Sequence, residues 1–271
     1  MIFNTGEELR LAIRKEIFDK PTSGYASEYV QANLVILPKD WAYDFLLFSQ
    51  RNKKPCPILE VGEVGDYNTR FIAENADIRT DLSKYRVYEN GQLISEPKNL
   101  KDLWRDDFVF FLIGCSFSFE QALINAGLEL RHQTENVNVP MYNTNIMCNS
   151  AGKFKTSPLV VSMRPFNHKN AIKAVEITSD YPDVHGSPVH LGDPKIIGIN
   201  DINTPDYGDR VNIKDDEIPV FWACGVTPQK AALISKPPIM ITHSPGYMFV
   251  GDIKNSELKL WGERCLKFIM K

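Results

Sequence analysis

Long hydrophobic runs are missing from this 271-residue sequence. The longest, from Phe108 to Ile113, is the size of a strand, whereas a helix that spans a bilayer needs about 18–20 apolar residues. The stretch from Met1 to Glu8 also lacks the apolar segment of a secretory signal. We therefore expect a cytoplasmic protein that has no membrane partner.

An excess of positive charge is missing as well. The sequence holds 31 Lys and Arg against 34 Asp and Glu, which gives a formal net charge of −3, and it has no basic stripe. A protein that binds nucleic acid needs clustered cations to displace the counterions of the phosphates. We therefore expect no nucleic-acid partner.

Paired cysteines are the third absence. The five cysteines are far apart and form no CxxC pair, which argues against a zinc ribbon and a thioredoxin-like redox site. Free thiols in a reducing compartment explain them most simply. The sequence also has no Walker loop, no GxGxxG after a strand and no GxSxG elbow, which argues against a nucleotide enzyme and a standard hydrolase. We expect no cofactor and no bound metal.

What is present indicates a globular protein with a sizeable core. Hydrophobic residues make up 43% and charged residues 24% of the chain, both near the globular average. Apolar residues at helical spacing, with Asn4 or Thr5 as a cap, predict a helix over about 7–18, and a second helix is expected over about 38–52. Asn90-Gly91 between two apolar runs predicts a hairpin over 85–95.

Two stretches share the order strand, tight turn, helix. The first runs from Phe108 through Cys115 into a helix for which Ser118 and Gln121 match a capping box, and the second runs from Ile218 through Cys224 to Thr227-Pro228. This order is typical of α/β proteins, and we expect a mostly parallel or mixed sheet with helices on both faces. Residues 1–135 and 206–271 would form this main domain, and residues 136–205 a smaller inserted α+β domain.

Ligands of such sheets bind beyond the carboxyl ends of the strands, which predicts one rim of candidate residues. A helix N-terminus binds anions, so Ser116, Ser118 and Thr227 are candidate substrate-binding residues. The same position can activate Cys115 as a catalytic thiol, although a small buried cysteine at a tight turn is the alternative. His243 follows the last buried strand and is a candidate catalytic residue.

A loop broken by Gly and Pro holds His185, His190 and Asp193. Histidine suits general acid–base work near neutral pH, so both histidines are candidate catalytic residues and Asp193 a candidate substrate contact. A metal site and a purely structural role in the loop are the alternatives. Arg131 and Arg164 end short strands and are candidates to bind a substrate carboxylate, the alternative being surface salt bridges.

Several unusual strings resemble the bacterial hydro-lyase family that is related to D-glutamate cyclase, and they follow the expected order over nearly the whole chain. They include Thr22-Ser-Gly-Tyr-Ala, Ala76-Asp-Ile-Arg-Thr-Asp-Leu, Gly114-Cys-Ser-Phe-Ser-Phe-Glu, Asn138-Val-Pro-Met-Tyr, Val161-Ser-Met-Arg-Pro, Val184-His-Gly-Ser-Pro-Val-His-Leu-Gly-Asp-Pro, Phe221-Trp-Ala-Cys-Gly-Val-Thr-Pro-Gln and Ile241-Thr-His-Ser-Pro-Gly. The resemblance implies a two-domain α/β lyase that removes water, in its best-defined form closing D-glutamate to 5-oxo-D-proline. It carries over no catalytic residue.

The residues and the resemblance together suggest a hydro-lyase for a small anionic amino or dicarboxylic acid. Closing D-glutamate needs a general base and acid, donors for the developing oxyanion, and a cation for the other carboxylate. Two alternatives stay open: a non-catalytic binder of a small carboxylic acid, and a metal-dependent hydrolase that uses His185, His190 and Asp193, with His243 as a further candidate ligand. The sequence leaves the oligomeric state open, a homodimer included.

Overall fold

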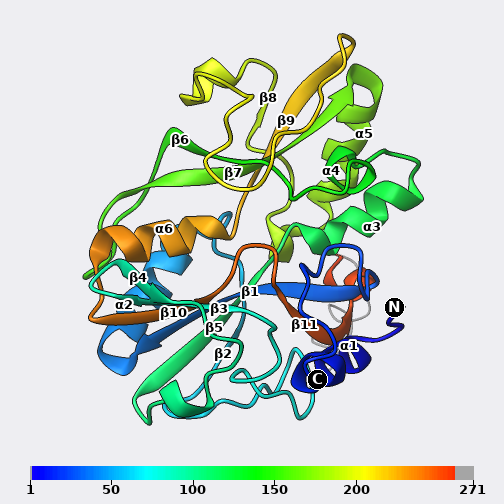
Figure 1. Cartoon of the computed structure of the whole chain (residues 1–271). Coiled ribbons are helices and arrows are strands. Elements are labelled where there is room, and N and C mark those ends of the chain that lie inside the picture. Colours follow the sequence, from blue (N-terminus) through cyan, green and yellow to red (C-terminus); the bar gives the residue numbers. More distant parts are fainter. Residues whose placement is uncertain (1, 260–271) are drawn as a thin grey trace, which may run out of the picture.

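The computed structural model describes residues 2–259 (Figure 1). The helices are α1 (Gly6–Arg14), α2 (Lys39–Arg51), α3 (Phe117–Asn125), α4 (Arg131–Thr134), α5 (His168–Ser179) and α6 (Val226–Ser235). The strands are β1 (Tyr29–Pro38), β2 (Ile58–Val61), β3 (Tyr85–Glu89), β4 (Gln92–Ser95), β5 (Phe108–Gly114), β6 (Met141–Cys148), β7 (Ser157–Asn167), β8 (His190–Leu191), β9 (Glu217–Ala223), β10 (Ile239–His243) and β11 (Phe249–Lys254).

The strands form two sheets. A seven-stranded sheet has the order β2-β5-β1-β10-β3-β4, with β11 also paired to β1, and a four-stranded sheet has the order β6-β7-β9-β8. Figure 1 shows the four-stranded sheet in the upper half of the molecule, the seven-stranded sheet in the lower half and α6 between them.

The expected mostly parallel or mixed sheet is wrong, because every strand pair described in residues 2–259 is antiparallel. The physical reason is β1, which the sequence did not reveal as a strand. It lies between β5 and β10 and runs antiparallel to both, so these two strands point the same way but do not pair with each other. The α/β composition of the fold is as expected.

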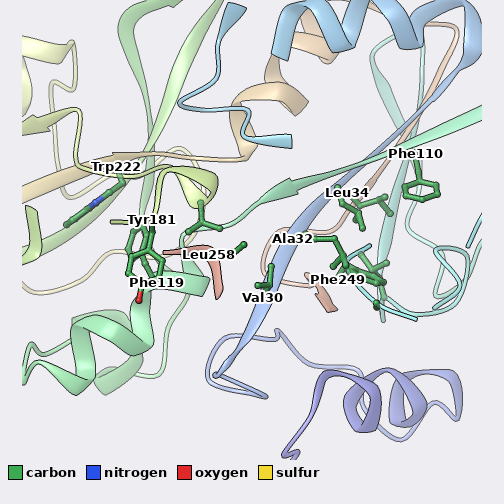
Figure 2. Close-up of a cluster of buried hydrophobic side chains, with 14 of the residues drawn as sticks. Val30, Ala32, Leu34, Phe110, Phe119, Tyr181, Trp222, Phe249 and Leu258 are labelled. Atoms are coloured by element: carbon green, nitrogen blue, oxygen red, sulfur yellow. The ribbon is translucent and has the colours of Figure 1, made fainter. Parts of the chain in front are cut away.

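Alternate residues of β1 and β5 enter two different hydrophobic clusters, because successive side chains of a strand point to opposite faces. Leu34 and Phe110 belong to the first cluster, together with side chains of α3 and α5. Val35 and Phe111 belong to the second, together with side chains of α2 and α6. Figure 2 shows the first cluster, in which the Phe119 and Trp222 rings lie 5.7 Å apart between centroids. Burial on both faces explains why all seven residues of β5 are apolar or glycine and buried.

Several local predictions are confirmed. Thr5 caps α1 by accepting a hydrogen bond from the Glu8 backbone N–H. The hairpin between β3 and β4 turns at Asn90 and Gly91, whose φ angles of 48° and 82° fit a type I′ turn. The capping box at Ser118 is wrong, because α3 begins two residues earlier, with Ser116 at its N-cap.

The four-stranded sheet takes β6, β7 and β8 from the segment 136–205 and β9 from the segment that follows. The division into a main and an inserted domain stays a prediction. Cys56, Cys115, Cys148 and Cys224 are buried free thiols, and Cys265 lies outside the described residues. Among residues 2–259, no helix has the length and apolar character that crossing a membrane requires.

Candidate active site

A buried arginine links the four-stranded sheet to the start of α3. Arg164 lies on β7 and is 0% exposed. It donates to Ser116 Oγ and Ser162 Oγ, both at 3.1 Å, and from Nε to Glu120 Oε1 at 3.0 Å. Two predicted residues, Ser116 and Arg164, therefore meet, and Glu120 provides the negative charge that a buried guanidinium needs.

Glu120 is the centre of this polar group. Its Oε1 lies 3.1 Å from His132 Nε2, and its Oε2 accepts a hydrogen bond from Gln133 Nε2 at 2.8 Å. Burial acts to raise the pKa of this carboxyl, but the charges of His132 and Arg164 outweigh burial and lower it to about 2. Glu120 therefore stays ionised near neutral pH.

His132 lies on the wall of a large cavity of about 620 Å³. The ring is 2% exposed, and the ring of Phe117 stacks on it with centroids 6.5 Å apart and an interplanar angle of 14°. A histidine whose one nitrogen faces a carboxylate is a suitable general base, because the carboxylate orients the ring and stabilises its protonated form. The other lining residues are Lys20, Pro21, Ser23, Gly24, Tyr25, Gln133, Asn136, Val137, Asn138 and Asp209.

No sequence pattern indicated the pair of His132 and Glu120. Glu120 lies in α3 and His132 in α4, so helical spacing does not connect them. The sequence marked the cavity only indirectly. Two of the strings that resemble the hydro-lyase family, at Thr22–Ala26 and Asn138–Tyr142, both contribute residues to its wall. Only the fold brings these segments together.

Cys115 and Cys224 lie in one small hydrophobic cluster at the starts of α3 and α6. Burial raises the pKa of both thiols, that of Cys224 to about 11. The backbone N–H groups of Phe117 and Val226 and the charge of Arg164 act in the opposite direction. Neither thiol is ionised to a large extent near neutral pH without a further partner.

Ser118 and Thr227 bind neighbouring strands of the protein. Ser118 Oγ accepts a hydrogen bond of 2.9 Å from the Gln31 backbone N–H, and Thr227 Oγ1 accepts one of 3.0 Å from that of Val160. Both side chains are almost fully buried, with exposed fractions of 1% and 0%.

His185 and His243 are buried in separate places. Nδ1 of His185 lies 2.9 Å from the Lys54 carbonyl oxygen, and Nδ1 of His243 accepts a hydrogen bond of 3.0 Å from the Leu34 backbone N–H. Burial lowers the pKa of each imidazole to about 4. Both are therefore neutral at pH 7.

The remaining predicted residues have partners within the protein. His190 Nε2 lies 2.8 Å from the Asp193 carbonyl oxygen, and the Asp193 side chain accepts from the Lys195 backbone N–H. Arg131 pairs with Glu217 at 2.7 Å and with Glu129 at 3.1 Å. In the part of the chain that the structure describes, no three His, Cys, Asp or Glu side chains come close enough to hold a metal ion. The metal-dependent alternative therefore has no ligand set there.

Comparison with known proteins places the chain in a family. The family described as D-glutamate cyclase matches residues 109–252. "Putative hydro-lyase GK2103" of Geobacillus kaustophilus is 56% identical over 94% of this chain and 96% of its own length. "Putative hydro-lyase" of Clostridium beijerinckii is 58% identical over 93% of this chain and 96% of its own.

A nitrogen repressor-like protein, MJ0159 from Methanococcus jannaschii, aligns over 92% of this chain and 98% of its own with 11% identity. Its TM-score of 0.35 is too low to support an argument about the fold. The sequence relatives, by contrast, show that the chain belongs to the D-glutamate cyclase family, together with relatives named as hydro-lyases.

Proposed function

We propose that this protein is a hydro-lyase that closes D-glutamate to 5-oxo-D-proline with loss of water. The observation that carries the proposal is the contact of 3.1 Å between His132 and the ionised Glu120 on the wall of the 620 Å³ cavity. The family supports the class of reaction, and the cavity has room for a small amino acid.

The reaction requires two proton transfers. The α-ammonium group loses two protons, one before and one after its nitrogen attacks the γ-carboxyl carbon, and an oxygen of that carboxylate gains both protons and leaves as water. Nε2 of His132 faces Glu120, and we assign to Nδ1 the transfer of each proton from the nitrogen to the leaving oxygen. Glu120 holds the ring and stabilises its protonated form, and Arg164 holds Glu120.

The cavity also carries groups that suit an amino acid substrate. The Lys20 ammonium group and the Asp209 carboxylate both line it, so opposite charges are available for the carboxylate and the ammonium group of the ligand. Polar side chains of Ser23, Asn136 and Asn138 lie on the same wall. Holding both ends of glutamate would bring its amine near its γ-carboxyl group, which supplies the proximity that ring closure needs.

The residues expected from the sequence remain predictions that variants must test, and the hydroxyls of Ser118 and Thr227 accept from backbone N–H groups of the protein itself. The catalytic candidates are His185, His190, His243 and Cys115, and the candidate substrate contacts are Ser116, Ser118, Arg131, Arg164, Asp193 and Thr227. We also propose that the protein is cytoplasmic and that it acts without a cofactor. Assays of the purified protein without added cofactor test the second point, and its molecular mass in solution gives the oligomeric state.

Proton NMR of purified protein with D-glutamate, L-glutamate and 5-oxo-D-proline tests the reaction. We expect 5-oxo-D-proline to appear from D-glutamate and not from L-glutamate. If no compound is converted while D-glutamate raises the melting temperature of the protein, the protein is a binder of small carboxylic acids rather than a cyclase. If nothing changes and nothing binds, D-glutamate is not the substrate.

A further inference from the structure

The cavity beside His132 is larger than glutamate requires. Its volume of about 620 Å³ lies within the range of about 300–1,000 Å³ that is usual for sites that hold drug-sized ligands. A water molecule takes up about 30 Å³ in the liquid, so this space corresponds to about twenty non-hydrogen atoms, roughly twice the number in glutamate. A substrate that continues beyond the γ-carbonyl group therefore fits.

The charged side chains on the cavity wall match one carboxylate and one ammonium group. Among the described residues that line the cavity, Lys20 is the only Lys or Arg and Asp209 the only Asp or Glu. Asp209 is fixed in place, because its carboxylate accepts a hydrogen bond of 2.9 Å from the Asn138 N–H and its own N–H donates to the Asn138 carbonyl oxygen at 3.1 Å. The α-carboxylate and the α-ammonium group of one amino acid satisfy this pair.

A γ-carboxylate would find no cation of its own on this wall. His132 must be neutral to accept a proton from the substrate nitrogen, so it cannot also supply the missing positive charge. Glu120 Oε1 lies 3.1 Å from the same ring and adds a buried negative charge, and Arg131 is paired with Glu217 and Glu129. Because an unpaired buried charge is costly, the charges of the site favour a substrate whose γ-group is neutral.

The uncharged part of the wall suits an amide. Asn136 and Asn138 line the cavity with side chains that can both donate and accept hydrogen bonds. Ser23 lies on the same wall, and its Oγ is shielded from solvent and has no hydrogen-bond partner among the described residues. An amide offers such groups both an N–H donor and a C=O acceptor, whereas a carboxylate offers acceptors only.

We infer that the preferred substrates are γ-amides of D-glutamate, γ-D-glutamyl peptides included, which the protein closes to 5-oxo-D-proline with release of an amine. The α-nitrogen forms a bond to the γ-carbonyl carbon, and the bond from that carbon to the amide nitrogen breaks. Both protons that the α-ammonium group loses pass to the amide nitrogen, which leaves as an ammonium group. Charge is conserved and no other reactant takes part. The inference rests on the ring closure proposed for the same site and exchanges water for an amine as the leaving group.

Proton NMR measures ring closure of γ-D-glutamylglycine, D-glutamine and D-glutamate, each with the purified protein and without it. We expect kcat/KM for γ-D-glutamylglycine to exceed that for D-glutamate by about tenfold or more, because the γ-carboxylate is left without a partner. D-isoglutamine is the matched control compound, since it has the same atoms as D-glutamine but carries the amide on its α-carboxyl group. It should close at least about tenfold more slowly than D-glutamine.

A second cation on the cavity wall should shift the preference toward D-glutamate. Asn136 is exposed and has a φ of 54°, and Asn136→Lys should raise kcat/KM for D-glutamate relative to γ-D-glutamylglycine by about threefold or more. Asn75→Lys is the matched control, because Asn75 is also exposed, has a φ of 52° and lies outside this cavity. It should leave the ratio unchanged. An equal ratio in the wild type and a folded Asn136→Lys protein would contradict the charge argument.

The outcomes separate this inference from the proposed cyclase. Conversion of D-glutamate without conversion of either amide overturns the inference and leaves the cyclase intact. Conversion of the amides alone supports the inference and removes D-glutamate as the substrate. His132→Asn should stop closure of the amides as well, and amides that a folded His132→Asn protein closes at the wild-type rate would overturn their assignment to this cavity.

Discussion

His132 Nε2 lies 3.1 Å from Glu120 Oε1, although the two residues belong to separate helices and Glu120 also holds Arg164 from the second sheet. This contact connects the fold to the proposed chemistry. The Glu120 carboxylate compensates the buried charge of Arg164 only while it is ionised, and the same negative charge orients His132 on the cavity wall. Stability and catalysis should therefore both depend on Glu120.

Replacing Glu120 by Gln should destabilise the protein by about 3–5 kcal/mol, because Arg164 is left as an uncompensated buried charge. Urea unfolding followed by circular dichroism measures the change. Glu129→Gln is the matched control, since the Glu129 side chain is 45% exposed where it pairs with Arg131, and it should cost less than about 1 kcal/mol. Equal losses in the two variants would contradict the central role of Glu120.

Acid should destabilise the protein well above the pH at which its carboxylates titrate. His185 and His243 have pKa values of about 4 in the folded protein, against 6.5 when exposed. The unfolded chain therefore binds more protons between pH 6.5 and 4, so stability is fully present above 6.5 and falls as the pH drops through this range. Each histidine should contribute a loss of about 3 kcal/mol.

The free energy of unfolding at a series of pH values checks this expectation. The variant His243→Gln should show a smaller loss between pH 6.5 and 4 than the wild type. His168→Gln, at the exposed first residue of α5, should retain the full loss. A wild-type protein of constant stability across this range would show that neither histidine is buried as described.

Ser118→Ala should act on stability rather than on substrate affinity. The change leaves the buried Gln31 backbone N–H without its acceptor, which costs about 1–3 kcal/mol. Thr227→Val should do the same to the N–H of Val160. Denaturation and steady-state kinetics separate the two roles. An unchanged stability with a raised KM would instead favour the substrate-binding role that the sequence suggested.

The sequence predicted local structure better than it predicted the sheet. The cap at Thr5, the turn at Asn90-Gly91 and the buried strand at Phe108 depend on neighbouring residues, and all were recognised. The direction of strand pairing was not, because it depends on β1 lying between β5 and β10, which are far apart in the chain.

The candidate site shows the same limit. Ser116 and Arg164 were expected from their turns, and the structure brings them to 3.1 Å. Glu120 and His132 were not expected, because a buried acid–base pair between two helices leaves no fixed spacing in the sequence. Unusual strings at Thr22 and Asn138 did mark the cavity, since segments from distant parts of the chain form its wall.

The most direct test of the central claim is the rate of 5-oxo-D-proline formation from D-glutamate by the folded variant His132→Asn. His185→Asn and His243→Asn test the alternative catalytic histidines, and His168→Asn serves as the exposed control. We predict a loss of about 100- to 10,000-fold for His132→Asn, the usual contribution of a general acid–base, and no change for His168→Asn. A His132→Asn protein that converts D-glutamate at the wild-type rate would contradict it, and loss in His185→Asn or His243→Asn alone would move the acid–base role to that histidine.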